Sequence, residues 1–312
     1  MNNEFILSNG MALPIVKGFR EQVKSNWRNA YKDFDNTNDE MSMDKINNLK
    51  NDIKHGTQIL AKCGIPIQGK KIMDVGCYLG LQCFGAMEMG ASEAVGIDIP
   101  EYYVNQSTNK ESVDASKVLE NKRDKIRKLH PHLDQSKISF KDVSVFEMDY
   151  ENEFDIIFSW ETFEHIMNPK EALARIYKAL KPGGIVFSQY NPFFCISGGH
   201  SMCTLDFPFA HTLLTAEDFK KYVETIVPEN CPSKYSELSY NFFTKNLNRM
   251  TQSNLTKYIN DVGFELVNFM STPDLNLLNV IDDSTLDSAK TIHPTLTLND
   301  LLCSNVFFIG RK

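Results

Sequence analysis

The chain of 312 residues is long enough for one large domain or for a core with a substantial cap. Hydrophobic residues make up 42% of the sequence and charged residues 23%, as in ordinary soluble proteins, and no apolar run is long enough to span a bilayer. The net charge of −7 argues against a large surface for nucleic acid.

Residues 1–69 precede the first predicted strand. Their apolar residues, among them Trp27, Tyr31 and Ile46, recur at roughly helical spacing. We therefore expect an N-terminal helical cap over residues 1–69, packed on the rest of the protein. Trp27 or Tyr31 could instead close over a ligand as a lid, although aromatic stripes at this spacing more often belong to a core.

Two strands that end in polar turns follow the cap. Residues 70–80, KKIMDVGCYLG, predict a short buried strand, a glycine turn at Gly76 and Gly80, and the start of a helix. A second apolar strand, residues 94–98, ends in the carboxylate of Asp98. A glycine turn after one strand and an acid at the tip of the next are typical of nucleotide binding in a doubly wound α/β sheet, where the acid binds ribose hydroxyls.

The remaining apolar runs complete an alternating pattern of strands and helices. Five more strands are predicted, at residues 137–140, 154–160, 185–188, 264–269 and 306–309. Helices are predicted at residues 81–89, 102–129 and 251–262. We expect residues 70–190 to form the core of a seven-stranded sheet and residues 251–312 to complete it.

Two segments interrupt this pattern. Residues 191–250 are rich in Phe, Pro, Ser, Asn and Tyr, and we interpret them as an inserted, substrate-binding lid over the carboxyl-terminal edge of the sheet, where ligands bind in such folds. The aromatic residues of this insertion could line a pocket, or they could simply form a core. Residues 271–300 are interpreted as a second, loop-rich insertion.

The glycine turn excludes a dinucleotide fingerprint, because Tyr78 occupies the place of the middle glycine. The stretch Asp74–Gly80 resembles motif I of the class I S-adenosylmethionine-dependent methyltransferases, whose usual form carries a glycine at position 78. The resemblance covers roughly residues 70–190 and 251–312, and it implies a Rossmann-like fold that binds S-adenosylmethionine. The cofactor-binding residues implied are Asp74, Gly76, Cys77, Tyr78, Gly80, Asp98, Ile99, Asp142, Val143 and Trp160.

A possible metal site follows the fourth predicted strand, in the stretch Glu161-Thr162-Phe163-Glu164-His165. On a helix, positions i, i+3 and i+4 share one face, so two carboxylates and an imidazole could ligate one divalent cation. The pattern is similar to that of small-RNA 2′-O-methyltransferases and ubiquinone-biosynthesis O-methyltransferases, and this resemblance implies His211 as a further ligand. The metal could be Mg2+, Mn2+, Fe2+, Co2+ or Zn2+. Alternatively, the Glu–His pair orients a helix without metal.

Three histidines are candidates for catalysis. His200 follows Gly198 and Gly199 and could act as a general base that takes a hydroxyl proton, because an imidazole titrates near neutrality. The alternative is a loop histidine bonded to the backbone. His165 and His211 are the other two candidates.

The expected function is transfer of a methyl group from S-adenosylmethionine to a hydroxyl of a small molecule, with or without a divalent metal. The acceptor would be a sugar, a glycan precursor or a phenol-like compound. RNA 2′-O-methylation and a non-catalytic S-adenosylmethionine-binding regulator are the alternatives. Seven scattered cysteines without a CxxC pair predict free thiols, and with no signal-peptide pattern they indicate the cytoplasm. Neither nucleic acid nor a membrane is expected as a partner, and the oligomeric state is open.

Overall fold

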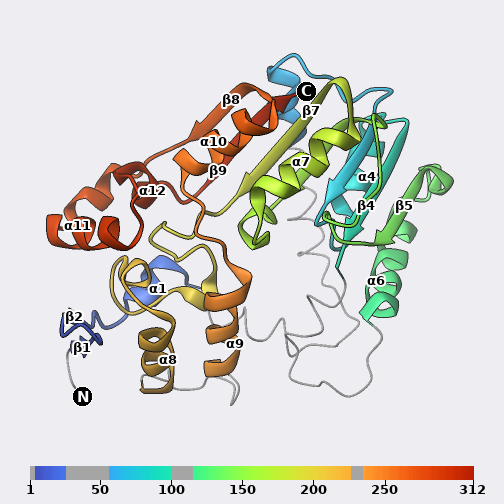
Figure 1. The fold of residues 1–312 in the computed structure, drawn as a ribbon. Helices are drawn as coiled ribbons and strands as arrows, with labels where there is room; N and C mark the ends of the chain where they lie inside the picture. Colours follow the sequence, from blue (N-terminus) through green and yellow to red (C-terminus); the bar gives the residue numbers. More distant parts are fainter. Residues whose placement is uncertain (1–3, 26–55, 100–114, 226–234) are drawn as a thin grey trace.

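The computed structural model describes residues 4–25, 56–99, 115–225 and 235–312 (Figure 1). The aromatic stripe at Trp27 and Tyr31, together with Ile46, lies outside the described residues. So does the first half of the helix predicted over residues 102–129, whose second half is α6 (Ala115–Leu129). Among the described helices, none combines the length and apolarity needed to cross a membrane.

A seven-stranded sheet forms the centre of the described chain, in the order β5-β4-β3-β6-β7-β9-β8. β9 is antiparallel to both of its neighbours, and the other paired neighbours are parallel. The predicted doubly wound α/β fold is therefore confirmed. The strands are β3 (Lys71–Val75), β4 (Glu93–Asp98), β5 (Ile138–Asp142), β6 (Phe154–Trp160), β7 (Leu180–Tyr190), β8 (Glu265–Ser271) and β9 (Val306–Arg311).

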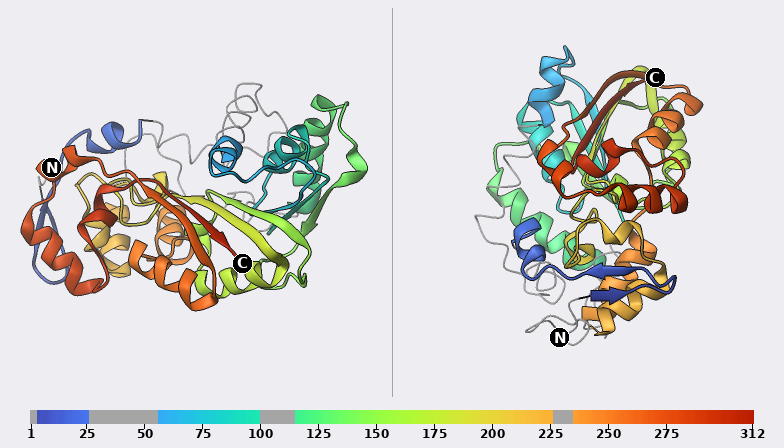
Figure 2. Two further views of the ribbon diagram at one scale, coloured as in Figure 1. Left: turned by 90° about the horizontal axis from the view of Figure 1, so that it is seen from above. Right: turned by 90° about the vertical axis from the view of Figure 1, so that its left-hand side faces the viewer.

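Helices cover both faces of this sheet (Figures 1 and 2). On one face α4 (Leu81–Glu88) and α6 pack through Phe84 and Ile126 against β4 and β5. On the other face lie α7 (Pro169–Ala179) and α10 (Gln252–Val262). Both of these helices begin at a side-chain cap, Asn168 and Thr251 respectively, and their buried stripes at helical spacing provide the apolar surface that holds them on the sheet.

The N-terminal region differs from the expected helical cap. Residues 56–62 are helical, and Leu60 packs under the sheet, as a cap would. The first described residues, however, form a hairpin of β1 (Glu4–Ile6) and β2 (Ala12–Pro14), followed by the short α1 (Phe19–Val23). The sequence signal for the hairpin is Asn9-Gly10, where Gly10 adopts a φ of 86°. This hairpin lies beside residues 191–250 in both views of Figure 2.

Residues 191–250 form a second hydrophobic core rather than a loose flap. Their helices are η3 (Ser201–Cys203), η4 (Ala210–Thr212), α8 (Ala216–Thr225), α9 (Tyr235–Asn241) and the π-helix η5 (Phe242–Asn246). Phe219 and Phe243 stack with ring centroids 4.0 Å apart. The N-terminal hairpin joins this core, because Phe5 stacks on Phe207 at 6.2 Å and the buried Arg20 of α1 pairs with Asp206 at 2.9 Å. Phe207, Phe219 and Phe243 are core residues here.

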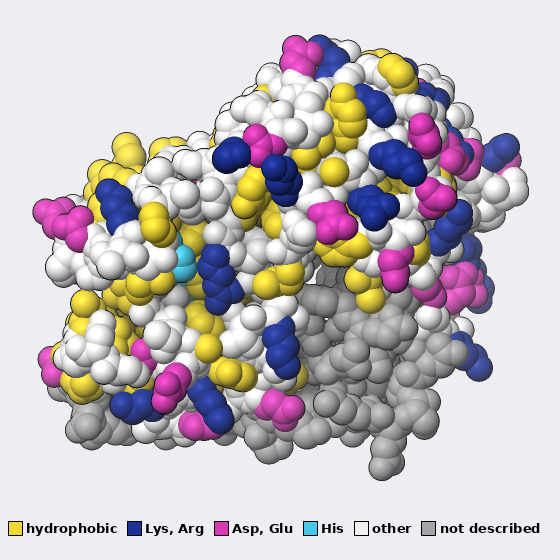
Figure 3. All heavy atoms as spheres, viewed as in Figure 1, with side chains coloured by type: hydrophobic (Ala, Val, Ile, Leu, Met, Phe, Trp, Pro, Cys, Tyr) yellow, Lys and Arg dark blue, Asp and Glu magenta, His cyan; other side chains and the backbone are white. Residues whose placement is uncertain are grey.

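Residues 271–300 are helical, which corrects the expectation of a loop-rich insertion. They contain η6 (Leu275–Asn279) and α11 (Asp283–Ile292), and α12 (Leu298–Leu302) follows. Ala289 and Leu301 belong to the same core as the aromatic residues of 191–250. Hydrophobic side chains at Leu275 and Ile292 are exposed, and yellow side chains lie over α11 in Figure 3.

Candidate active site

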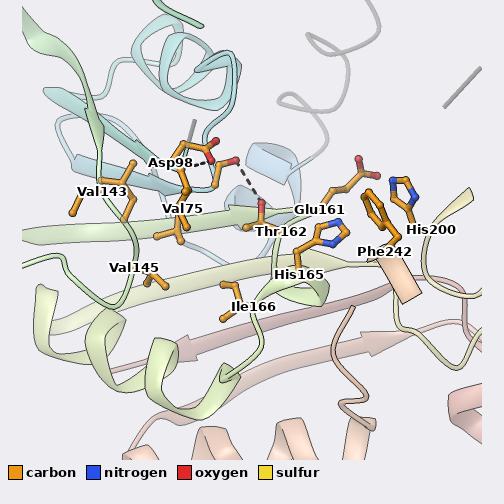
Figure 4. Close-up of a pocket in the computed structure, with 13 residues that line it drawn as sticks. Val75, Asp98, Val143, Val145, Glu161, Thr162, His165, Ile166, His200 and Phe242 are labelled. Atoms are coloured by element: carbon orange, nitrogen blue, oxygen red, sulfur yellow. Dashed lines mark hydrogen bonds between the residues drawn. The ribbon is translucent and has the colours of Figure 1, made fainter. Parts of the chain in front are cut away.

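A cavity of about 250 Å³ lies at the carboxyl-terminal ends of β3, β4 and β6 (Figure 4). It is lined by Val75, Gly76, Ile97, Asp98, Ile99, Val143, Val145, Glu161, Thr162, His165, Ile166, His200 and Phe242. A second cavity of about 450 Å³ adjoins it and shares Asp98, Ile99 and Val143. Asp142 lines this second cavity. Five of the ten predicted cofactor residues therefore border the cavities, namely Gly76, Asp98, Ile99, Asp142 and Val143.

Asp98 is fixed at the junction of the two cavities. Its Oδ2 accepts a hydrogen bond from the backbone N–H of Tyr78 at 2.5 Å, and its Oδ1 accepts one from the N–H of Ile99 at 2.7 Å. These bonds tie the tip of β4 to the glycine turn after β3. They hold a carboxylate in one orientation at the point where a ribose would be bound.

The glycines of the turn are required by neighbouring side chains as well as by backbone conformation. Gly76 has a φ of 79°, and a Cβ there would lie 2.2 Å from Oγ1 of Thr162. Gly80 has a φ of 76°, and its Cβ would meet the ring of Phe140 at 2.2 Å. We expected a ligand to require close approach at both positions. Gly76 does line the cavity, whereas Gly80 does not.

Tyr78 adopts a left-handed conformation, with a φ of 42°. This explains why a glycine is usual at this place in the resembling motif, since a side chain there costs about 1–2 kcal/mol. Two hydrogen bonds hold the strained residue, one from its N–H to Asp98 and one to its carbonyl from Nε of Arg123 at 2.9 Å. Arg123 is buried on α6, 4.5 Å from the centroid of the Phe140 ring. Its apolar neighbours at helical spacing, Leu119 and Ile126, were the sequence signal for this buried position.

Three of the predicted cofactor residues lie behind the cavity. Asp74 is buried, and neither of its carboxylate oxygens has a partner among the described residues. Burial, assisted by repulsion from Asp98, raises its pKa to about 8. Cys77 is buried against Arg123, with Sγ 3.6 Å from Nη2. The ring of Trp160 packs against Phe187 and Phe307 at about 6 Å and is not part of the cavity lining.

The end of the cavity at Asp98 fits the predicted cofactor. Gly76 lines the cavity without a side chain, Asp98 offers its carboxylate, and Ile99 and Val143 provide apolar surface. A nucleoside requires this combination, because its sugar hydroxyls seek an acceptor and its base seeks apolar walls. The site therefore fits the adenosine portion of S-adenosylmethionine.

The stretch Glu161–His165 is not the helical face that its spacing predicts. Glu161 lies in a bend with a φ of 48°, and only Phe163–His165 form a single turn of 3-10 helix, η2. Glu161 and His165 consequently face the cavity, whereas Glu164 turns into the protein. Its Oε1 accepts a hydrogen bond from the backbone N–H of Asn191 at 3.1 Å, and burial raises its pKa to about 8.

His211 lies apart from these residues. It is buried in η4, with its ring edge-on to Phe193 at 5.2 Å, and it does not line the cavity. Burial lowers its pKa to about 3. The ligand atoms of Glu161, Glu164, His165 and His211 do not lie within 4.8 Å of one another as a set. The residues predicted to bind a metal therefore do not fit a metal site in this arrangement.

His165 and His200 face each other at the far end of the cavity, with ring centroids 5.9 Å apart (Figure 4). Nδ1 of His165 lies 2.7 Å from the carbonyl oxygen of Asn246, so Nδ1 carries the proton and Nε2 is the acceptor. His200 carries its proton on the other ring nitrogen. Its Nδ1 accepts a hydrogen bond from the N–H of Met202 at 3.2 Å, so the proton resides on Nε2. Burial lowers the pKa of His165 to about 4 and that of His200 well below its usual value.

Phe242 and Thr162 are among the cavity residues that were not anticipated from the sequence. Phe242 begins the π-helix η5 and stacks on His200 with centroids 4.2 Å apart. Thr162 lies between the two ends of the cavity, and its Oγ1 donates to the carbonyl of Trp160 at 3.0 Å. π-Helices are rare and frequently occur at functional sites, but no local sequence pattern signals one.

Comparisons with known proteins agree with this arrangement. Residues 47–268 match the family described as the methyltransferase domain. The ubiquinone biosynthesis O-methyltransferase of Dictyostelium discoideum is 26% identical over 126 residues, covering 39% of this chain and 36% of that protein. Its counterpart from Dechloromonas aromatica is 30% identical over 125 residues, covering 39% and 45%. The match thus spans less than half the length of these relatives.

Among solved structures, the magnesium protoporphyrin IX methyltransferase from Synechocystis, with bound SAH, has the same fold. The two structures superpose with a TM-score of 0.50 over 94% of this chain and 99% of that one, at 9% sequence identity. The family match extends over most of the sheet and over the cavity residues up to Phe242. The chain therefore belongs to the methyltransferase-domain family.

Proposed function

We propose that the protein methylates a hydroxyl group of a small, phenol-like molecule. The observation that carries this proposal is one cavity with a nucleoside-binding end at Asp98 and two neutral imidazoles with Phe242 at the other end. An aromatic ring favours a flat, partly apolar acceptor. The similarity to ubiquinone-biosynthesis O-methyltransferases supports the same class.

The two imidazoles have complementary roles in this proposal. Nε2 of His165 accepts the proton of the acceptor hydroxyl, because the carbonyl of Asn246 keeps the ring proton on Nδ1. Nε2–H of His200 donates a hydrogen bond to the acceptor, and Phe242 holds that ring in place by stacking. Of the three histidines that the sequence offered as catalytic candidates, this proposal makes His165 the base and His200 a hydrogen-bond donor. Bound S-adenosylmethionine supplies a methyl group already activated by its sulfonium.

A metal is not part of this proposal, since Glu164 and His211 face other parts of the protein. RNA is not the proposed acceptor either. On the face seen in Figure 3, basic side chains alternate with acidic ones over α7 and α10, in pairs such as Lys170–Asp261 and Lys178–Asp149. On this face, such alternation provides no continuous basic surface for a phosphate backbone.

The test is turnover with a panel of acceptors, namely catechols and other phenols, sugars and a short RNA, with detection of the methylated product. His165→Gln is expected to lower kcat by roughly 10²–10⁴-fold while S-adenosylmethionine affinity is retained. His293→Gln, a half-buried histidine outside the cavity, serves as the matched control. Full activity of His165→Gln would exclude it as the base, and methylation of RNA alone would overturn the acceptor class.

The pH profile tests the same assignment independently. The pKa of His165 is lowered to about 4, so the ring stays neutral, and competent as a base, at all higher pH values. We therefore expect kcat/KM to decline only as the pH falls through about 4, provided the fold survives. A decline near pH 6.5 would indicate a solvated imidazole instead.

A further inference from the structure

We propose that the protein binds a divalent transition metal of the zinc type at Glu88, His130 and His132. In the described part of the chain these side chains form a group whose ligand atoms all lie within 4.8 Å of one another. Glu88 ends α4, and the two histidines follow α6 directly. Two imidazoles and one carboxylate are a common zinc donor set, and Co2+ or Ni2+ accept the same ligands.

The site lies at the opposite edge of the sheet from the cavity. α4 begins at the glycine turn and runs back to the amino-terminal ends of the strands, where the N–H of Gly69 donates to the carbonyl of Gly90 at 2.7 Å. β3 starts beside this contact, at Lys71. The site is therefore independent of the histidines that face the acceptor.

The geometry needs little adjustment to hold an ion. Nδ1 of His130 lies 2.6 Å from Oε1 of Glu88, and Nε2 of His132 lies 3.9 Å from the same oxygen. Tetrahedral zinc with bonds near 2.1 Å places its ligand atoms about 3.4 Å apart, between these two values. Changes of about 0.8 Å and 0.5 Å in these two distances, made by the exposed His132 and Glu88, would suffice.

One ligand is already held rigidly. His130 is only 3% exposed, and its ring stacks on Phe84 with centroids 5.5 Å apart and planes 14° apart. Nε2 of Gln135 donates to the carbonyl oxygen of His130 at 2.9 Å, which fixes the backbone after α6. A fixed buried imidazole beside two adaptable exposed ligands lowers the entropy lost on binding.

The ion would clamp α6 to α4. Both helices support the cofactor turn, since α4 starts after Gly80 and α6 carries Arg123, which binds the carbonyl of Tyr78. The metal would thus stabilise the turn from a distance and take no part in methyl transfer. The alternative is that Glu88 and His130 only form a hydrogen bond that joins the helices, and in that role His132 contributes nothing.

This difference defines the experiment. Zinc binding to the full-length, metal-free protein is measured by calorimetry and by thermal unfolding with and without Zn2+, and Co2+ reports tetrahedral coordination by its visible spectrum. We expect one equivalent to bind and to raise the Tm. His132→Ala should leave the metal-free Tm unchanged, because this side chain is 63% exposed, yet lower zinc affinity at least about tenfold.

Two further variants complete the test. Glu88→Gln keeps an oxygen that can accept from His130, so it should preserve the metal-free protein and weaken zinc binding by about tenfold or more. His200→Gln removes an imidazole of the cavity and should not change zinc affinity. Unchanged affinity in His132→Ala would overturn the proposal, and so would loss of binding only in His200→Gln, which would place the ion in the cavity.

Discussion

The two ends of the cavity are built in different ways. At the Asp98 end, the lining comes from the ends of adjacent parallel strands, and backbone N–H groups hold the key carboxylate. At the His165 end, the lining comes from η2, the loop at His200 and the π-helix η5, which belong partly to the second hydrophobic core. The first end rests on backbone geometry, and the second rests on the packing of aromatic side chains. The two should therefore be separable by mutation.

The largest effect is expected from the aromatic core. Phe243→Ala removes a ring that stacks on Phe219 at 4.0 Å and lies 4.7 Å below the guanidinium of Arg249, at a cost of roughly 3–5 kcal/mol in unfolding free energy. Because Phe242 is its neighbour in η5, turnover should fall while S-adenosylmethionine affinity is retained. Chemical denaturation and calorimetry measure the two quantities. Leu278→Ala, at an exposed site, is the control and should change stability by less than about 0.5 kcal/mol.

The next largest effect is expected from a substitution at the Asp98 end of the cavity. Gly76→Ala places a Cβ 2.2 Å from Thr162 Oγ1 in a left-handed backbone and should destabilise the fold by roughly 2–4 kcal/mol and weaken cofactor binding. Gly64→Ala is a matched control, because its φ of 74° is similar and nothing lies near its Cβ, so only about 1 kcal/mol is expected. Adding Thr162→Ala should restore part of the loss in Gly76→Ala. Equal losses in the two alanine variants would show that the contact with Thr162 is unimportant.

A smaller effect concerns pH. Glu164 has a pKa raised to about 8 from an ordinary value of 4.5, so the folded protein holds a proton that the unfolded chain releases between these values. Stability therefore declines as the pH rises from about 4.5 to 8, and Asp74, also near 8, contributes in the same direction. Glu164→Gln should make this decline shallower by about 1.4 kcal/mol per pH unit. Denaturation at several pH values measures the slope, and the exposed Glu151→Gln should leave it unchanged.

The smallest effect is expected at Tyr78. Tyr78→Gly relieves the strained φ but gives up side-chain packing and makes the unfolded chain more flexible, so the unfolding free energy should change by less than about 1 kcal/mol. Cofactor affinity should be retained, because the hydrogen bonds that join Tyr78 to Asp98 and to Arg123 use its backbone N–H and carbonyl. A loss of affinity beyond tenfold in calorimetry would instead assign the ring itself to the cofactor site.

The contrast between the two ends also explains what could be predicted from the sequence. The apolar runs in the sequence were sufficient to predict the sheet, and the turns that follow two of them placed Gly76 and Asp98 at the cavity, since both features depend on short local patterns. The left-handed bend at Glu161 invalidated the helical spacing on which the metal site rested. The stacking of Phe242 on His200 joins segments distant in the chain, and no periodicity reports such contacts. The dipeptide Asn9-Gly10 is a hairpin signal, but the helical spacing of the apolar residues from Trp27 onward led us to expect helices over the whole N-terminal region.

The position of β9 has a consequence for how the protein reaches its fold. β9 lies between β7 and β8 and pairs with both, through Ile309 to Phe187 and to Asn268. β7 and β8 are therefore not neighbours, and neither can gain its inner row of hydrogen bonds before Val306–Arg311 has left the ribosome. During synthesis, the finished parallel strands must wait with β7 as an open edge, which is where another chain could pair. The yield of folded protein should thus depend more on how well that edge is shielded during translation than on the stability of the completed sheet.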